Sequence, residues 1–349
     1  MIRKLAAASV AMLLWLQGGA AHAASEFKIV TASERGTYIQ IGRNLAQFVA
    51  PQADIDLEAV PSAGSAENVR RLRFESGVKF ALVQSDVYQA FLDQAALGNK
   101  DAIDMIRPLR VILPLFNEEI YFVVRADSEL NNIHEIRNAK INAGELGSGT
   151  ALTTTTLYGL MFGSTIPQAN ASFLSNEDAL VKLITDKSVD VVAIIAGQPA
   201  KLLVDMKPEA RNLIKLLRFD PSQPASQAAL KTYVAATVRA SSYPNLLTDD
   251  LPALAVKAFL VTYDFTLKST QESMQKFGRS LCENFSVLQE KGHPKWREVE
   301  FALPDLGRGW VYYPTTANEI RSCTAGRNKP KAAPTKSCSQ QEQILGLCR

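Results

Sequence analysis

The residues best suited to bind a small ligand lie in a glycine-rich loop around Ser148. Residues 140–162 read as a short strand, a turn with three glycines and a helix, and the turn ends in Ser148, Gly149 and Thr150. Glycine lets the backbone turn sharply and come close to a ligand. The first amides of a helix point out of its N-terminus and carry a partial positive charge. The loop is therefore a candidate site for an anionic group, bound by backbone amides and by the two hydroxyl groups.

The same loop allows a simpler interpretation, because glycines also occur in plain connections between a strand and a helix. No lysine follows the last glycine, so this is not a Walker A loop, and the full dinucleotide-binding pattern is missing. The repetition of similar loops along the chain favours a ligand site. Three earlier strand–loop–helix units carry small or polar residues in their loops, at residues 33–38, 61–65 and 84–86. In open α/β sheets, ligands bind at the carboxyl ends of the strands, where such loops meet.

The side chains in these loops form the candidate ligand-binding set. A guanidinium at the mouth of a cleft can hold a carboxylate through two parallel hydrogen bonds. The first loop offers Arg35 for this role, although Arg35 could instead pair with Glu34 on the surface. Other members could cap helices or pack, and capping is the favoured role of Asp86. The candidates from these loops are Arg35, Tyr38, Ser65, Asn68, Gln84, Asp86, Ser148, Gly149 and Thr150.

Catalytic chemistry has less support among the residues. A nucleophilic serine needs a base, usually histidine, but His134 and His293 do not follow strands, and the Gly-x-Ser-x-Gly motif is absent. Glu118 and Glu119 are adjacent, and neighbours in a strand point to opposite faces. We therefore expect them to form a solvated turn between two strands rather than an acid–base pair. We predict no catalytic residue, no cofactor and no metal ligand, since no Cys-x-x-Cys motif occurs.

The start of the chain indicates export. Arg3 and Lys4 precede an apolar run, and Ala21–Ala23 has the small-x-small form of a cleavage site. Residues 1–23 are therefore predicted to be a secretory signal peptide, which places the mature protein in the periplasm. The 349-residue chain has a formal net charge of +3, and removal of the two leader cations lowers it to +1. Such a nearly neutral protein is not expected to bind nucleic acid, and we expect a monomer.

The cysteines lie in the last quarter of the chain and suggest disulfides, because an exported protein meets an oxidising compartment. Three pairings of Cys282, Cys323, Cys338 and Cys348 are possible. We favour Cys282–Cys323 with Cys338–Cys348, since the second pair closes a short loop in the tail. Residues 323–349 are predicted to form a Cys-containing C-terminal tail.

The order of the predicted elements indicates two α/β lobes. One set of strand–loop–helix units precedes the glycine-rich loop and a second set follows it, while the late part of the chain favours helices, including residues 251–262. Crossing segments near residues 114–121 and 218–236 would join the lobes, with a hinge near Leu115 and Tyr233. The predicted division is a signal peptide at 1–23, lobe I at 24–115 plus 235–322, lobe II at 116–234 and the tail at 323–349.

Motifs in a fixed order resemble the TAXI family of solute receptors from tripartite ATP-independent periplasmic (TRAP) transporters. The resemblance covers roughly residues 26–290, most of the mature body. It implies an α/β, two-lobe type II periplasmic-binding-protein fold with a ligand cleft between the lobes. It also adds Thr37 and Gln198 to the candidate ligand-binding residues. The motifs are Gly36–Tyr38, Gly64–Asn68, Gln84–Val87, Gly147–Thr150 and Ala196–Pro199.

The resemblance also implies a function. Such a receptor captures a small carboxylate or amino acid, similar to glutamate or 2-oxoglutarate, and delivers it to the membrane subunits of a TRAP-type transporter. Two features depart from the family pattern: Ser33–Arg35 stands where a glycine-rich loop is usual, and a Cys-containing tail follows about Pro304. A ligand-binding sensory subunit of a signalling system and, with less support, an exported serine hydrolase are the alternatives.

Overall fold

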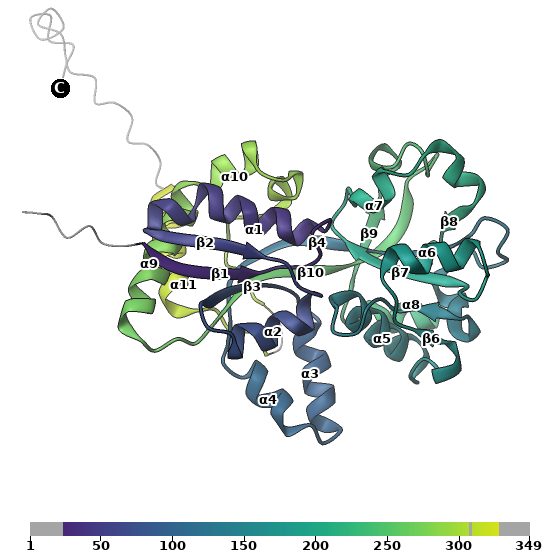
Figure 1. Ribbon diagram of the computed structural model, residues 1–349, viewed down its shortest axis with the longest axis horizontal. Helices are drawn as coiled ribbons and strands as arrows, with labels where there is room; N and C mark the ends of the chain where they lie inside the picture. The colour runs from purple at the N-terminus through teal and green to yellow at the C-terminus, as the bar shows by residue number, and fades with distance from the viewer. Residues whose placement is uncertain (1–23, 307–308, 328–349) are drawn as a thin grey trace, which may run out of the picture.

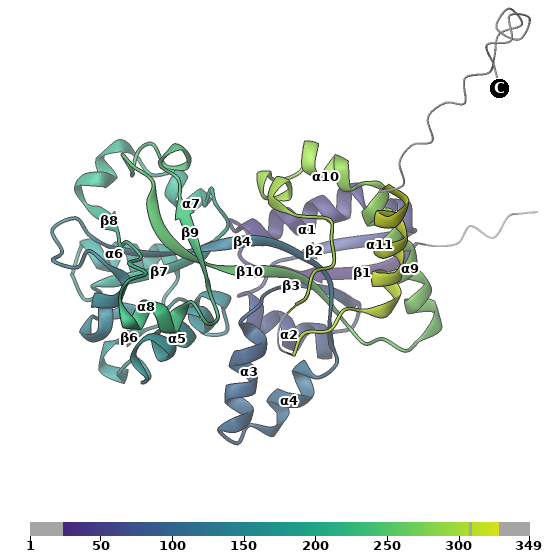
Figure 2. The ribbon, with the colours of Figure 1, turned by 180° about the vertical axis from the view of Figure 1, so that it is seen from behind.

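Two α/β lobes lie side by side and share one continuous sheet (Figure 1). The computed structural model describes residues 24–306 and 309–327. Two long strands, β4 (Leu109–Arg125) and β10 (Leu251–Tyr263), run from one lobe into the other. The views from both sides show these strands as the connection between the lobes (Figure 1, Figure 2).

The remaining elements divide between the lobes. Lobe I contains the elements β1 (Ser25–Val30), β2 (Ile55–Val60), β3 (Val78–Gln84), α1 (Thr37–Phe48), α2 (Ser65–Phe74), α3 (Val87–Ala96), α4 (Lys100–Ile106), α9 (Lys268–Glu283), α10 (Phe285–Lys291), α11 (Pro314–Arg327) and the short 3-10 helices η1 (Ala50–Ala53) and η6 (Pro294–Glu298). Lobe II contains the elements β5 (Ile141–Asn142), β6 (Ala171–Ser172), β7 (Val191–Ala196), β8 (Ile214–Leu216), β9 (Val234–Val238), α5 (Gly149–Phe162), α6 (Asn176–Ile184), α7 (Lys201–Val204), α8 (Pro224–Ala229), η2 (Ile133–Asn138), η3 (Gln168–Asn170), η4 (Pro208–Asn212) and η5 (Ala240–Ser242).

The sheet runs through both lobes in the order β2-β1-β3-β10-β4-β7-β5-β6, with β8 beside β4 and β9 beside β10. In lobe I, β1 is parallel to β2 and β3, and β10 lies antiparallel between β3 and β4. In lobe II, β5 is parallel to β6 and β7. Parallel strands need helical crossovers, which is why helices accompany each lobe's sheet. The predicted two-lobe type II periplasmic-binding-protein fold is confirmed.

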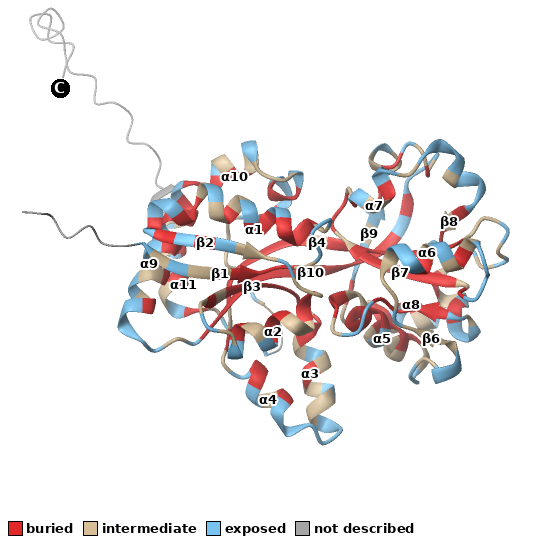
Figure 3. Cartoon of the chain, in the orientation of Figure 1, coloured by how far each residue is buried: buried red, intermediate tan, exposed pale blue. Residues whose placement is uncertain are grey.

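Helices cover both faces of the lobe I sheet because its central strands are apolar on both sides. In β3, Phe80 and Leu82 pack in one core with residues of α1, α9 and α10, while Ala81 and Val83 pack in a second core with residues of α2, α3 and α4. The central strands β3 and β10 are buried, whereas the outer faces of the helices are exposed (Figure 3). The sheet therefore provides a fixed platform for the loops at its strand ends.

The predicted helix at residues 251–262 is wrong, because these residues form β10. The sequence LPALAVKAFLVTY is almost entirely buried and pairs with β3, β4 and β9. A strand that is covered on both faces shows no alternation of apolar and polar residues, so its pattern resembles that of a buried helix.

The predicted solvated turn at Glu118 and Glu119 is also wrong. β4 is a single strand of 17 residues, and Asn117, Glu118 and Glu119 pair directly with Lys257, Val256 and Ala255 of β10. The two glutamates are only 4% and 5% exposed. Ladder hydrogen bonds on both sides hold these polar residues in the strand, since Glu119 also pairs with Ala196 of β7. Two acids therefore lie buried where the chain passes between the lobes.

The chain returns to lobe I along β10, and β9 pairs with the first half of that strand. The lobe boundary predicted at residue 115 falls within β4, and the one predicted near residue 234 falls at β9. We propose that the lobes divide within β4 and within β10, which leaves β9 in lobe II. The predicted signal peptide lies outside the described residues. Within the described ranges, no helix combines the length and the apolar character needed to cross a bilayer.

A disulfide joins the last helix to the body of lobe I. Cys282 of α9 is bonded to Cys323 of α11, so the favoured pairing of these two residues is confirmed. Residue 323, where the tail was predicted to start, is thus part of a packed helix. The second predicted pair, Cys338–Cys348, lies outside the described residues.

Removal of this disulfide should destabilise lobe I. The bond spans 41 residues of sequence, and a cross-link of this kind restricts the unfolded chain. We expect Cys282→Ala with Cys323→Ala to lower the free energy of unfolding by about 2–5 kcal/mol in chemical denaturation. Repeating the measurement with a reducing agent is the control, because reduction should bring the wild type down to the variant. Equal stability of the two proteins without reductant would contradict a structural role for the bond.

Candidate ligand-binding cleft

A cavity of about 150 Å³ lies between the lobes, and both lobes contribute to its wall. Lobe I supplies the loops that follow β1, β2 and β3, as the sequence predicted, and lobe II supplies the starts of α5, α6 and α7. The predicted residues that line the cavity are Arg35, Thr37, Tyr38, Ser65, Gln84, Ser148, Gly149 and Thr150. The polar and charged lining residues that sequence reasoning did not assign to the site are Ser33, Glu118, Glu145, Ser175, Asn176, Glu177 and Lys201.

Four helices, α1, α2, α5 and α6, begin at the cavity wall. The first amides of a helix have no partner within the helix, and their dipoles favour a negative charge. The N-cap residues of α1 and α2 are Gly36 and Gly64, which make no side-chain cap hydrogen bond. In α5 and α6, Ser148 and Ser175 accept a hydrogen bond from the helix instead. The helix starts therefore place partial positive charge from the backbone on the wall, and the Ser148 hydroxyl is used as a cap.

The lobes touch along the backbone beside this cavity. A Cβ atom on Gly149 would overlap the side-chain amide of Gln84 and lie 2.9 Å from Ser65 Oγ, and one on Gly64 would lie 2.9 Å from the Gly149 amide nitrogen. The Glu67 amide also donates a hydrogen bond of 3.2 Å to the Gly147 carbonyl of the opposite lobe. Glycine at position 149 is therefore required for this contact.

Arg35 stands at the rim of the cleft and reaches across it. Its guanidinium nitrogens lie 3.5 Å from Glu177 Oε1 and 3.4 Å from Asp205 Oδ2, both in lobe II. Glu34, the alternative partner predicted from the sequence, pairs with Arg43 at 2.6 Å. The Arg35 side chain is 56% exposed, so each ion pair contributes little, within about 1 kcal/mol. A role of Arg35 in holding a ligand carboxylate stays a proposal.

Glu118 lines the cavity from the middle of β4. The hydroxyl group of Tyr38, in the first turn of α1, donates a hydrogen bond of 2.7 Å to Glu118 Oε2. Burial raises the pKa of Glu118 to about 7, although hydrogen bonds from Tyr38 and Gln84 and the charge of Lys295 lower it. One signal could have revealed this residue: no glycine or proline separates residues 117–119 from the flanking apolar runs.

Glu119, its neighbour in β4, forms a buried ion pair behind the cavity. Lys295 Nζ lies 3.1 Å from Glu119 Oε1, and the lysine side chain is fully buried. The other oxygen, Glu119 Oε2, accepts a hydrogen bond of 2.8 Å from the Gln198 amide. The Gln198 side chain bonds to the backbone of Thr237 and Arg239. Gln198 therefore fixes a turn of lobe II and does not line the cavity.

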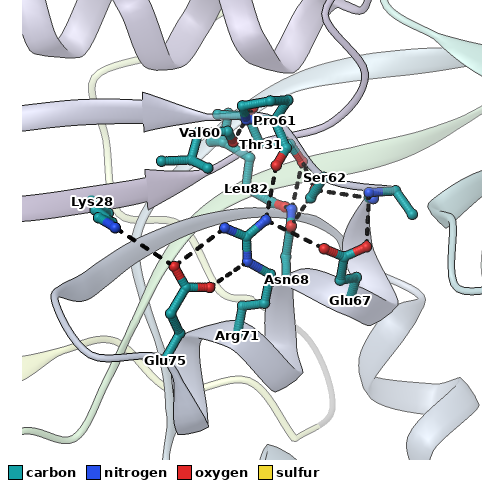
Figure 4. Close-up of polar contacts among 12 residues, drawn as sticks. Lys28, Thr31, Val60, Pro61, Ser62, Glu67, Asn68, Arg71, Glu75 and Leu82 are labelled. Carbon is teal, nitrogen blue, oxygen red and sulfur yellow. Dashed lines mark hydrogen bonds and ion pairs between the residues drawn. The ribbon is translucent and has the colours of Figure 1, made fainter.

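Asn68 also lies outside the cavity wall, because its side chain is turned into lobe I. Its amide group donates a hydrogen bond of 2.7 Å to the Leu82 carbonyl and a second one to the Thr31 carbonyl. Figure 4 shows Asn68 beside Ser62 and Leu82, with Arg71 of the same helix held between two glutamates. Asn68 thus joins α2 to the ends of two strands and positions the second cleft loop.

Asp86 connects the two lobes below the cleft. Its Oδ2 atom accepts hydrogen bonds from Thr153 Oγ1 at 2.7 Å and from the Tyr233 hydroxyl at 2.9 Å, both in lobe II. Its Oδ1 atom is buried and has no hydrogen-bond partner among the described residues. Burial raises the pKa of Asp86 to about 6, and the bonds from Thr153 and Tyr233 lower it only in part. No side-chain cap hydrogen bond to α3 is formed, so the favoured capping role is not realised.

Comparison with known proteins identifies a family and several similar folds. A model of the NMT1-like family matches residues 29–303, which is well over half of the chain. Among solved structures, XAC2383 from Xanthomonas citri bound to ATP has 14% identity and a TM-score of 0.46 and covers 86% of this chain and 96% of its own. PhnD1 from Prochlorococcus marinus in complex with methylphosphonate has 13% identity and a TM-score of 0.48, with 88% and 99% covered. A putative sulfonate-binding protein, SsuA from Methylobacillus flagellatus, has 12% identity and a TM-score of 0.47, with 85% and 76% covered.

Substitution of Gly149 should prevent the lobes from closing. We expect Gly149→Ala to keep a larger radius of gyration than the wild type in small-angle X-ray scattering, with both proteins saturated with the solute that co-purifies, because the new methyl group overlaps Gln84. Gly159→Ala is the matched control on the same helix, since no atom lies within 4 Å of a Cβ at that position. If Gly149→Ala contracts as far as the control does, the backbone contact is not needed for closure.

Asp86 should make stability depend on pH. The folded protein holds the Asp86 proton more tightly than the unfolded chain, since its pKa is about 6 instead of 3.8. Asp86 therefore lowers the stability of the wild type as pH rises from about 4 to about 6, and the contribution of this residue is constant above that range. Asp86→Asn removes this dependence. Its free energy of unfolding relative to the wild type should therefore rise over the same pH interval, by up to about 3 kcal/mol. The melting temperature of the variant relative to the wild type should rise with it.

The matched control is Asp101→Asn on α4, where the side chain is exposed. Its melting temperature should follow that of the wild type at every pH. Parallel curves for Asp86→Asn and the wild type between pH 4 and pH 7 would rule out this contribution of Asp86.

Proposed function

The chain belongs to the NMT1-like family, and from that premise we propose that it is an extracytoplasmic solute-binding protein. It captures a small carboxylate or amino acid and delivers this solute to a TRAP-type membrane transporter. The observation that carries the proposal is the convergence of four helix N-termini, those of α1, α2, α5 and α6, on one cavity between two lobes. Backbone amides at such positions bind carboxylates without any cationic side chain.

The two-lobe wall of the cavity supports capture by closure. A solute that touches the loops of both lobes binds the closed state more tightly than the open state, so it shifts the population toward closure. Gly149, Ser65 and Thr37 lie at contacts between the lobes, where Thr37 Oγ1 is 3.5 Å from the Gly197 carbonyl. Elements that pass between the lobes absorb the rotation, and β4 and β10 are placed to do so.

The hydroxyl groups at the cleft support binding rather than catalysis. Ser148 Oγ accepts a hydrogen bond of 3.0 Å from the Ala151 amide, and Ser65 Oγ bonds to Gln84. A serine nucleophile needs a neighbouring base, whereas His134 belongs to η2 and His293 precedes η6. Neither histidine lines the cavity. We therefore propose a binding protein rather than an enzyme, and we expect it to use no cofactor.

Delivery to a TRAP-type transporter rests on the sequence motifs of the cleft loops. All five motifs contribute residues to the cavity wall, among them Thr37, Ser65, Gln84, Gly149 and Ala196. The predicted signal peptide supports a periplasmic location for such a receptor.

Native mass spectrometry and calorimetry test the proposal. Protein purified without refolding should carry a small carboxylate or amino acid, and this compound should rebind to the stripped protein. Thr150→Val removes one hydroxyl group from the cavity wall and should weaken binding about 3- to 10-fold, the range for one hydrogen bond. Thr156→Val, on the same helix but away from the cavity wall, is the control. Absence of any bound or rebinding carboxylate or amino acid would refute the proposed ligand class.

A further inference from the structure

The charged side chains around the cleft are not balanced. The two cations of its wall, Arg35 and Lys201, are both engaged by acids of lobe II. Arg35 contacts Glu177 and Asp205, and Lys201 Nζ lies 2.8 Å from Asp205 Oδ2. These contacts satisfy the positive charges within the protein itself. The remaining ionisable carboxyl groups of the wall, Glu118 and Glu145, are therefore left without a cation of the wall.

Glu118 is the more informative of these two acids because it is buried. Only 4% of its surface is exposed, and a buried carboxylate without a counter-charge is costly. Lys295 is the cation whose charge acts on Glu118. Its ammonium group is bound by Glu119 at 3.1 Å and by Glu298 at 2.7 Å. In the part of the chain that the structure describes, no cationic side chain forms an ion pair with Glu118. The Tyr38 hydroxyl group donates to Oε2, the Gln84 side chain also bonds to this carboxyl group, and both of these partners are neutral.

A buried acid on the wall of a ligand cavity, beside helix ends that attract a carboxylate, fits a ligand with charges of both signs. We propose that Glu118 determines specificity by pairing with a protonated amine, so that the solute is an amino acid rather than a 2-oxo acid or a simple dicarboxylate. The inference rests on the proposed function and narrows its ligand class. An ammonium group offers three donors to the carboxylate, while the ligand carboxylate faces the helix N-termini.

The same acid disfavours the competing ligands. A 2-oxo acid of equal size would place a carbonyl oxygen against Glu118, so two acceptors would meet without a proton between them. A second carboxylate at this position would add a repulsive charge. Discrimination of this kind, in which the wrong ligand leaves a buried polar group unpaired, is larger than discrimination by shape alone.

The protonation state of Glu118 provides a second test of its role, because the affinity for an amino acid should then depend on pH. Burial raises the pKa of Glu118 to about 7. Binding of an ammonium group requires the charged form, so affinity for an amino acid should rise as pH increases from 6 to 8. The groups that face Glu118 are Tyr38, Gln84, Glu119 and Lys295, and the charged groups around the cavity are Arg35, Lys201, Glu145 and Glu177.

Titration calorimetry with matched ligand pairs tests the proposal. The probes are L-glutamate against 2-oxoglutarate and L-alanine against pyruvate, because each pair differs only in the amine. We expect the wild type to bind at least one of these amino acids at least 10-fold more tightly than its oxo acid. Glu118→Gln, which keeps the shape and an acceptor for Tyr38, should weaken the amino acid at least 10-fold and leave the oxo acid unchanged or improved. Glu290→Gln, on the exposed side of α10, is the control.

Each outcome has a defined meaning. Tighter binding of an oxo acid, with no effect of Glu118→Gln, would overturn the role of Glu118 and leave the proposed solute-binding function intact. Binding of none of the four probes, together with no carboxylate in the purified protein, would overturn both. If Glu118→Gln fails to fold, the comparison of each amino acid with its oxo acid in the wild type, together with the pH profile, tests the proposal. Affinity for the amino acid that rises from pH 6 to pH 8 supports the proposal, and a flat profile refutes it.

Discussion

One buried ion pair, between Glu119 of β4 and Lys295 of η6, connects the two lobes at a strand that passes between them. A single carboxylate holds three parts of the molecule together: the crossing strand, the lysine of lobe I and the Gln198 amide of lobe II. Both charges are removed from water, so loss of Lys295 would leave the Glu119 carboxylate without its cation, at a cost of about 3–5 kcal/mol. Lys295 also pairs with Glu298 at 2.7 Å. Gly197 makes room for the lysine, because a Cβ atom there would lie 3.0 Å from Lys295 Cε.

This ion pair also explains the character of the neighbouring acid. Glu118 and Glu119 are adjacent in β4, yet Lys295 bonds to only one of them. The other is left on the cavity wall with a tyrosine hydroxyl group as its partner. β4 therefore carries one carboxylate, Glu119, that is neutralised by a lysine. The other, Glu118, forms no ion pair within the described residues and can pair with a ligand. The helix N-termini on the same wall have the opposite polarity, so the cleft presents regions of both signs to a ligand.

The sequence was sufficient to predict the two lobes and the loops that meet between them. Strand–loop–helix units recur along the chain, and the carboxyl ends of parallel strands lie at one edge of a sheet, which brought Thr37, Ser65 and Gly149 to one cavity. The sequence could not show whether a polar side chain at a helix start faces a ligand or its own lobe, and Asn68 faces its own lobe. Glu119 was misjudged because its partner, Lys295, is 176 residues away in the chain. Such a distant counter-charge leaves no local pattern.

The position of β10 within lobe I determines the order in which the molecule can be completed. β10 lies between β3 and β4, and its Ala258 pairs with Gln84 of β3. Lobe II also waits for β10, because the first half of this strand supplies Leu254 and Val256 to its core and pairs with β9. Until β10 emerges, β3 has an unpaired apolar edge, which invites association with other strands. The β3 edge therefore stays open to such association until most of the chain has been made.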